Sequence, residues 1–189
     1  MKVFGQATPK HLIGINTSVT WKGFTLNAVA DYRGGHKIVN ILGRYMDFTG
    51  IAATTAVTGR QRFVFPNSSY LQDGKYVPNT SVTVDDANFN FWPGLYRSVS
   101  GNYVTSAAAW KLREVSITYD FPANWFGFTK IIQKASLTVS GRNLLLLKPN
   151  SNVWTDPEFN ETTGNDVGRT SENQAPPSRI FGATLTVQF

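Results

Sequence analysis

Few residues of this chain combine the types and the spacing that catalysis requires. The sequence contains no cysteine and only two histidines, His11 and His36, which lie far apart along the chain. The absence of cysteine excludes a disulfide scaffold and a thiolate zinc site. No nucleophile stands beside a general base. We therefore expect no enzymatic activity and no cofactor.

Two polar stretches offer the hard oxygen ligands that calcium prefers. They are Asp85-Asp86 with Asn88, and Asp156-Pro157-Glu158 with Asn160 and Glu161. The first lacks the ordered spacing of a calcium-binding loop. A solvated loop is the better explanation of either stretch, so we predict no metal site.

Aromatic residues in the loops are the natural surfaces on which a sugar could stack. Trp92, Tyr96 and Trp154 are the candidates for substrate contact. The same side chains could instead hold the loops together, and the sequence leaves both roles open.

The composition limits the class of protein. Charged residues make up 16% of the 189 residues, below the usual quarter of a soluble globular chain, while aromatic residues reach 13%. The net charge is +6, but the Lys and Arg residues are scattered without a basic run. Nucleic acid is therefore not an expected partner, because a surface that follows phosphates needs clustered cations. No apolar run approaches the roughly 18 residues of a membrane helix.

The final stretch of the sequence alternates between apolar and polar residues. Phe181, Ala183, Leu185, Val187 and Phe189 share one face, because successive side chains of a strand point to opposite sides. A strand of about ten residues with this alternation can cross a bilayer when it is tilted.

Four earlier stretches show the same pattern: residues 11–21, 24–33, 110–120 and 135–144. Asp31, Arg33 and Arg142 fall on the polar faces of these strands, which would face the lumen of a barrel. Trp110 and Leu112 are out of phase with Val115, which predicts a β-bulge near Arg113 or Glu114. On a regular strand Arg113 and Glu114 point to opposite faces, so no simple ion pair between them is expected.

Short and long connections alternate along the chain. Lys22-Gly23 and residues 123–134 make short turns, whereas residues 34–106 and 148–177 make long loops. Outer-membrane barrels place short turns on the periplasmic side and long loops outside. We predict an all-β fold: about five antiparallel transmembrane strands of a β-barrel, with long extracellular loops. Because five strands cannot close a barrel, we expect residues 1–189 to be the C-terminal part of a longer chain. The sequence shows no signal peptide.

Several motifs in this order resemble one family. They are Trp21-Lys22-Gly23-Phe24, Asp31-Tyr32-Arg33-Gly34-Gly35, the stretch from Trp110 to Pro122, Ser140-Gly141-Arg142-Asn143-Leu144, Asp156-Pro157-Glu158 and Pro176-Pro177-Ser178-Arg179. Together they resemble the C-terminal end of SusC/RagA-like TonB-linked outer-membrane transporters.

The resemblance implies a barrel of about 22 strands with an N-terminal plug. Such transporters import oligosaccharides or peptides across the outer membrane of Gram-negative bacteria, using TonB. They pair with a SusD-like surface lipoprotein. The plug and the segment that contacts TonB are expected outside this sequence. The resemblance also favours a structural loop role for Asp156-Pro157-Glu158 over a cation site.

The terminal strand carries a further expectation from the resemblance. Outer-membrane proteins are inserted by machinery that reads the last strand and its terminal aromatic residue. Phe181, Leu185, Val187 and Phe189 would form this assembly signal, so Phe189 is expected to affect insertion rather than transport.

Two other classes remain open. One is a soluble carbohydrate-binding β-sandwich, in which the apolar strand faces form a core. The other is an outer-membrane barrel that does not transport.

Overall fold

The computed structural model describes residues 2–84, 87–127, 131–158, 167–173, 175 and 177–189. The elements in chain order are β1 (His11–Trp21), β2 (Phe24–Gly34), β3 (Lys37–Val39), α1 (Ile41–Thr49), η1 (Ala53–Ala56), β4 (Ser69–Gln72), β5 (Lys75–Pro78), η2 (Ala87–Tyr96), η3 (Ser100–Tyr103), β6 (Val104–Ser106), β7 (Ala109–Asp120), η4 (Ala123–Phe126), β8 (Lys134–Leu147) and β9 (Ile180–Gln188).

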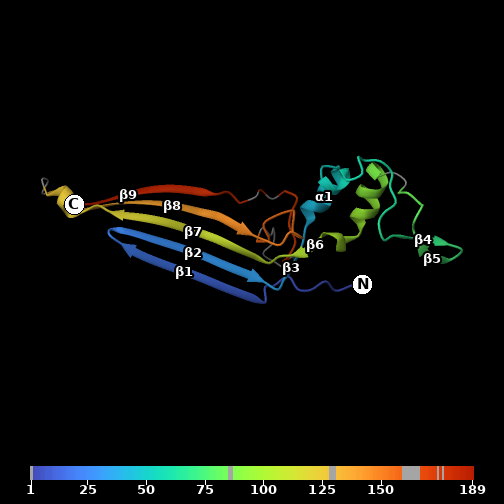
Figure 1. Cartoon of the computed structure of the whole chain (residues 1–189), viewed down its shortest axis with the longest axis horizontal. Helices are drawn as coiled ribbons and strands as arrows, with labels where there is room; N and C mark the ends of the chain where they lie inside the picture. The colour runs from blue at the N-terminus through green and yellow to red at the C-terminus, as the bar shows by residue number, and fades with distance from the viewer. Residues whose placement is uncertain (1, 85–86, 128–130, 159–166, 174, 176) are drawn as a thin grey trace. The chain divides into compact units, whose positions relative to one another are not determined.

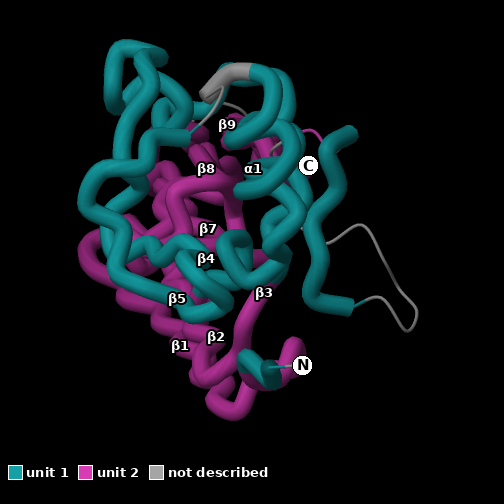
Figure 2. Tube along the Cα trace, turned by 90° about the vertical axis from the view of Figure 1, so that its right-hand side faces the viewer, with its two compact units in different colours: residues 1–4, 39–105, 161–174 teal, residues 5–38, 106–160, 175–189 magenta. Residues whose placement is uncertain are grey.

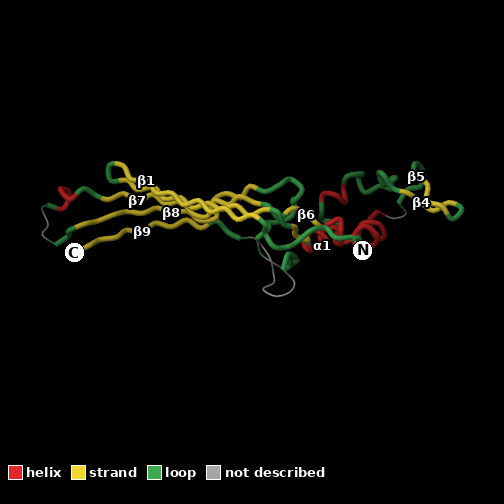
Figure 3. Tube along the Cα trace, turned by 90° about the horizontal axis from the view of Figure 1, so that it is seen from below, coloured by secondary structure: helices red, strands yellow, loops and turns green. Residues whose placement is uncertain are grey.

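The five long strands form one antiparallel sheet in the order β1-β2-β7-β8-β9 (Figure 1). They run side by side along their length (Figure 3). Each strand pairs with the next long strand of the sequence, as the hairpin order predicted. The all-β antiparallel class is thus confirmed. Among the described residues the sheet is open, because β1 pairs only with β2 and β9 only with β8.

The register places the apolar residues of all five strands on one face of the sheet. Leu26 lies opposite Ile117, which lies opposite Val139, and Val139 lies opposite Ala183. Directly paired residues of an antiparallel sheet point to the same side. The predicted shared face is therefore present; it includes Leu26, Ala28, Leu137, Val139, Leu185 and Val187.

A β-bulge interrupts β7 at Arg113, where the sequence predicted one. Val29 of β2 pairs with Glu114 and Ala30 with Leu112, so Arg113 is an extra residue of β7 on this side. The pairing with β8 shifts at the same place, but there Leu112 pairs with Leu145 and Glu114 with Arg142, so the extra residue belongs to β8. The extra residue in β7 keeps Leu112 and Val115 on the same face of the sheet.

The two short connections of the sheet lie at the same end. The turn at Lys22 and Gly23 leads directly into Phe24 of β2, which pairs with Tyr119 of β7. The centroids of these two rings lie 4.4 Å apart. The connection from β7 to β8, which contains η4, follows Asp120 at this end. The long connections leave from the opposite ends of β2 and β8, as predicted.

The chain forms two compact units, coloured in Figure 2. The sheet unit comprises residues 5–38, 106–160 and 175–189, and the loop unit comprises residues 1–4, 39–105 and 161–174. The chain passes between the units within β3 and within β6, which pair with each other.

Helix α1 in the loop unit covers Ile41–Thr49. The apolar spacing of residues 37–48 is compatible with a helix over that whole stretch, but residues 37–39 form β3. The N-cap residue Asn40 makes no capping hydrogen bond. Instead the Ile41 amide donates to the Thr170 hydroxyl at 2.9 Å. A distant segment thus satisfies the free amide at the start of the helix.

The core of the loop unit combines aromatic rings with buried polar groups. Phe91 and Trp92 are buried, and Phe63, Phe65 and Tyr96 pack against them. A second part of the core is polar. Asp47 is buried and accepts hydrogen bonds from the Tyr103 and Thr54 hydroxyls, each at 2.7 Å. These contacts explain why so long a connection is ordered over its described residues.

Candidate functional site

The polar face of the sheet gathers charged residues near the end from which the long connections leave. Asp31 of β2 lies opposite Lys111 of β7 in the register, so their side chains share this face. Arg33 lies two residues after Asp31 and therefore points the same way. The bulge at Arg113 brings one further cation to this face.

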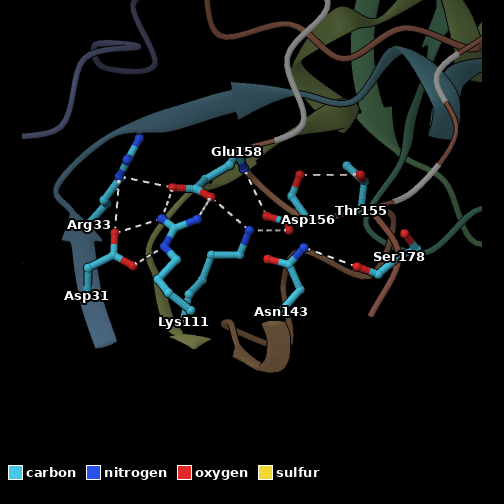
Figure 4. A network of polar contacts seen from close by, with 9 residues as sticks. Asp31, Arg33, Lys111, Asn143, Thr155, Asp156, Glu158 and Ser178 are labelled. Carbon is cyan, nitrogen blue, oxygen red and sulfur yellow. Dashed lines mark hydrogen bonds and ion pairs between the residues drawn. The ribbon is translucent and has the colours of Figure 1, made fainter. Parts of the chain in front are cut away.

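The loop that follows β8 brings two carboxylates to these cations. The Glu158 amide donates to Asp156 Oδ1 at 3.0 Å, which bends the backbone so that both side chains point to the sheet (Figure 4). The Lys111 ammonium bridges them, with Nζ 2.5 Å from Asp156 Oδ2 and 2.7 Å from Glu158 Oε2. The loop is therefore attached to β7 through both carboxylates.

Arg113 joins the loop to β2. Its Nε and Nη2 atoms donate to Asp31 at 2.5 and 2.7 Å. Its Nη1 atom donates to Glu158 Oε2 at 2.6 Å, and Nη2 also donates to Glu158 Oε1. Arg33 Nε lies 3.0 Å from Glu158 Oε1. A bidentate arginine between two carboxylates is the strong form of an ion pair.

We call this set the ion network; its members are Asp31, Arg33, Lys111, Arg113, Asp156 and Glu158. Three cations face three carboxylates, so the formal charges cancel. Asp156 and Lys111 are nearly buried, and Glu158 is mostly buried. In such surroundings paired charges interact more strongly than at an exposed surface.

The Glu158 carboxyl has a strongly perturbed pKa. Burial by itself raises this pKa, but hydrogen bonds from Arg113 and Lys111 and the charges of both residues outweigh burial and lower it to about 2. The carboxylate of Glu158 therefore stays charged far into the acid range.

The lowered pKa predicts acid weakening of the loop attachment. The contribution of Glu158 to stability is complete above its ordinary pKa of 4.5 and is lost as the pH falls towards 2. This pKa difference corresponds to about 3 kcal/mol. We expect unfolding measurements in detergent to show the stability gap between the wild type and Glu158→Gln shrinking from pH 5 to pH 2. A constant gap would contradict the pairing.

The arrangement is suited to holding a loop rather than to catalysis or metal binding. The carboxylates face Lys and Arg donors, which compete with a metal ion. Within the described ranges, no three His, Cys, Asp or Glu side chains are grouped so that they could hold a metal ion. The ion network therefore fixes the position of the loop that carries Asp156 and Glu158.

The three charged residues that were predicted on the polar face lie in two different places in the structure. Asp31 and Arg33 belong to the ion network. Arg142 lies apart from the network and pairs with Glu114 at 2.9 Å, where both side chains are exposed. Glu114 thus finds its partner across the strands, through the register that the bulge creates. The lumen-facing role of these residues remains a prediction.

The three aromatic candidates for substrate contact lie in different surroundings. Trp92 exposes 5% of its surface and stacks on Phe63, with ring centres 5.9 Å apart. Tyr96 is half-buried and contacts the edge of Trp92 in the same cluster. Trp154 is half-buried in the sheet unit, in the loop before Asp156. Their contact with a substrate remains a prediction.

The residues of the expected assembly signal lie on or directly after β9. Phe181 and Leu185 expose 72% and 63% of their surface, and Val187, opposite Ala135, is half-buried. Phe189 follows the strand and is exposed. Their role in assembly remains a prediction. Asp85, Asp86, Asn160, Glu161 and the Asn88 side chain lie outside the described residues.

Sequence reasoning missed Lys111, Arg113, Asp156 and Glu158 as one site. It assigned Asp156-Pro157-Glu158 a loop role, which the contacts agree with. No partner was predicted for Arg113, because the prediction assumed that this residue belongs to a regular strand. The available signal was the bulge itself, which lies opposite Val29 and Ala30 once β2 and β7 are paired and so brings Arg113 close to Asp31.

No helix among the described residues is long and apolar enough to cross a membrane.

Comparison with known proteins finds similar structures but no sequence family that matches this chain. No protein-family model matches the sequence, and no curated protein matches it. Three solved structures of the RagAB peptide importer or transporter match, among them its closed-closed and open-open states. TM-scores are 0.65, 0.62 and 0.63, each at 20% identity over 100% of this chain. The chain spans 18% of the length of those chains. The likeness establishes a shared fold with part of these transporter chains.

Proposed function

We propose that this chain forms five neighbouring wall strands and outer loops of a TonB-dependent outer-membrane importer of the SusC/RagA type. The observation that carries the proposal is the apolar face of the sheet. Large apolar side chains on it are exposed along every strand, among them Ile15, Leu26, Ile117, Val139 and Leu185. A continuous apolar surface of this kind requires lipid or a protein partner to cover it.

The opposite face supports a water-filled or plugged lumen. It carries Asn27, Ser116, Thr118 and Thr138, together with the exposed pair of Glu114 and Arg142. Charged side chains that face a lumen remain hydrated or paired, whereas on the lipid side they are costly. The difference between the faces favours a barrel wall over a β-sandwich, whose apolar face would be covered by a second sheet.

The unpaired edges of the sheet, at β1 and β9, support the proposal that further strands continue the sheet on both sides. An unpaired edge in lipid leaves backbone donors and acceptors unsatisfied, so a membrane sheet must continue until it closes. We propose that these strands, the plug and the segment that contacts TonB belong to a longer chain of which residues 1–189 are a barrel portion.

The likeness to RagAB peptide importers supports peptides as the substrate class, ahead of oligosaccharides. In the same way it supports pairing with a SusD-like surface lipoprotein. Outer-membrane localisation in a Gram-negative bacterium follows from the proposed barrel.

The test is uptake by cells that lack the gene, compared with cells that carry the full-length gene. We expect the protein in the outer-membrane fraction and accumulation of labelled peptides that stops when the proton-motive force is dissipated. A protein recovered in the soluble fraction would contradict the barrel and favour the β-sandwich. Correct membrane localisation without any uptake of peptides or oligosaccharides would contradict the importer and favour a non-transporting barrel.

A further inference from the structure

A cavity of about 410 Å³ lies in the loop unit beside the first residues of β4. Leu95 and Val99 line it and expose 65% and 51% of their surface, so these apolar groups face water. Ligand pockets of proteins have this size, and such walls are stabilised when an apolar group covers them. The apolar walls also include Phe65, Val82, Phe91 and Tyr96.

The polar groups of the cavity wall are neutral. None of the described residues that line it is Asp, Glu, Lys, Arg or His. The Asn79 amide group donates to the Ser68 hydroxyl and the Val82 carbonyl and accepts from the Val82 N–H. The Asn102 side chain donates to the Tyr96 carbonyl. The cavity therefore offers no counter-ion to a charged ligand and suits a neutral apolar group.

Strand β4 has an unpaired edge beside this cavity. Among the described residues β4 and β5 form a sheet of only two strands, so each has an edge without a partner strand (Figure 1). The cavity is lined by Ser69 and Tyr70 of β4 but by no residue of β5. Ser69 and Tyr70 point to opposite faces of the sheet, so a cavity lined by both reaches the edge of β4.

The register identifies the backbone groups at this edge. The Asn79 N–H donates to the Ser68 carbonyl at 2.9 Å, so these two residues form a hydrogen-bonded pair. Hydrogen-bonded and non-hydrogen-bonded pairs alternate along antiparallel strands. Ser69 and Leu71 therefore belong to non-hydrogen-bonded pairs and turn their N–H and C=O groups away from β5. The partner of Ser69 is Pro78, which has no N–H to donate, in agreement with this assignment.

We propose that the β4 edge binds an extended peptide whose apolar side chain enters the cavity. The peptide backbone pairs with Ser69 and Leu71 and continues the sheet as a third strand. The peptide residue opposite Tyr70 points to the same face as Tyr70, which lines the cavity. The peptide is the cargo of the importer, which rests on the proposed function, whereas the binding itself depends only on the loop unit.

The test measures peptide binding to the purified full-length protein by isothermal titration calorimetry. The protein is held in lipid nanodiscs, because free detergent would compete for the apolar cavity. The probe is the uncharged peptide N-acetyl-valyl-phenylalanyl-valinamide. Replacing its phenylalanine by aspartate should weaken binding about 10- to 100-fold through the lost apolar burial. Methylating the backbone nitrogen of each residue removes the donors to the strand edge and should also cost about 10- to 100-fold.

Two substitutions in one cross-strand pair locate the backbone contact. Leu71 and Tyr76 lie opposite each other, both are exposed, and their N–H groups point to opposite edges of the hairpin. Leu71→Pro removes a donor from the β4 edge and should weaken binding about 2- to 10-fold. Tyr76→Pro removes the matching donor from the β5 edge and should leave the affinity unchanged. Edge strands tolerate proline where the N–H points outward.

A second pair of substitutions locates the side-chain contact. Leu95→Asp places a charge at the cavity wall and should weaken binding about 10-fold or more. The control is Val57→Asp, because Val57 is 70% exposed, belongs to the loop unit and lies outside the wall of this cavity. This variant should bind the peptide as the wild type does.

Equal affinity for the phenylalanine and aspartate peptides would overturn the proposal, as would equal losses in Leu71→Pro and Tyr76→Pro. If the peptides do not bind but a surface lipoprotein does, in a manner lost in Leu71→Pro, the occupant is a partner chain and the proposal is wrong. If Leu71→Pro does not fold, the methylated peptide and the Leu95→Asp and Val57→Asp pair decide. Cells that fail to take up peptides would contradict the importer and leave the binding result unaffected.

Discussion

Replacing Arg113 by methionine is expected to release the loop that carries Asp156 and Glu158 from the sheet. Arg113 is the one side chain of the ion network that contacts both Asp31 and Glu158 through several nitrogen atoms. Methionine has a similar length but no donor. Its introduction leaves both carboxylates short of their main partner in mostly buried surroundings, which is more costly than losing an exposed pair.

We expect the loop attachment to weaken by about 2–4 kcal/mol. Opening of the loop would then be about 30- to 1,000-fold more frequent. Hydrogen exchange of residues 152–158, measured on the full-length protein by mass spectrometry, checks this directly. The Glu158 amide is a suitable reporter because it donates to Asp156 Oδ1 in the attached loop.

The matched control is Arg142→Gln. Arg142 also pairs with a carboxylate on the polar face, at 2.9 Å from Glu114, but its side chain is 64% exposed against 29% for Arg113. Exposed ion pairs contribute about 0–1 kcal/mol, so loop exchange in this variant should stay near that of the wild type. Similar exchange in both variants would contradict a special role for the ion network.

Replacing Val139 by arginine is expected to reduce sharply the amount of protein in the outer membrane. Val139 belongs to β8, is 53% exposed and lies between Ile117 and Ala183 on the apolar face. If this face contacts lipid, as proposed, an arginine there costs about 2–4 kcal/mol near the bilayer midplane and less towards its interfaces. Quantifying the protein in outer-membrane fractions measures the effect.

The control for this substitution is the next residue. Ser140 lies on the same strand at nearly the same height but faces the polar side, opposite Ser116 and Gly182. Ser140→Arg should leave membrane levels close to the wild type, because a lumen arginine remains hydrated. Equal losses in the two variants would show that the apolar face is not the lipid side, and the proposed barrel wall would then be wrong.

Much of the sheet could be predicted from the sequence because its determinants are local. Side chains of a strand alternate with every residue, so the pattern from Phe181 to Phe189 defines both the strand and its apolar face. The same pattern predicted the neighbouring strands within a few residues of their observed ends. Even the bulge at Arg113 was predicted, since a break in phase between Leu112 and Val115 appears in the sequence alone.

Contacts between distant segments were decided by the tertiary structure. Arg113 meets Asp31 and Glu158, which are 82 and 45 residues away, and no periodicity encodes such a meeting. The start of α1 depends likewise on Thr170, 129 residues after Ile41, so its first residues could not be assigned locally. Trp92 looks like a free stacking surface in the sequence, yet its neighbours bury it.

The sequence by itself thus determined the alternation of faces, the order of the strands and the place of the bulge. The tertiary structure decided which charges pair, where the loop after β8 is attached and which aromatic rings line a cavity. The physical reason is the distance along the chain between the residues that interact. Backbone geometry converts the nearest residues into a strand and its two faces, whereas ion pairs and cavities depend on side chains that only the folded chain brings together.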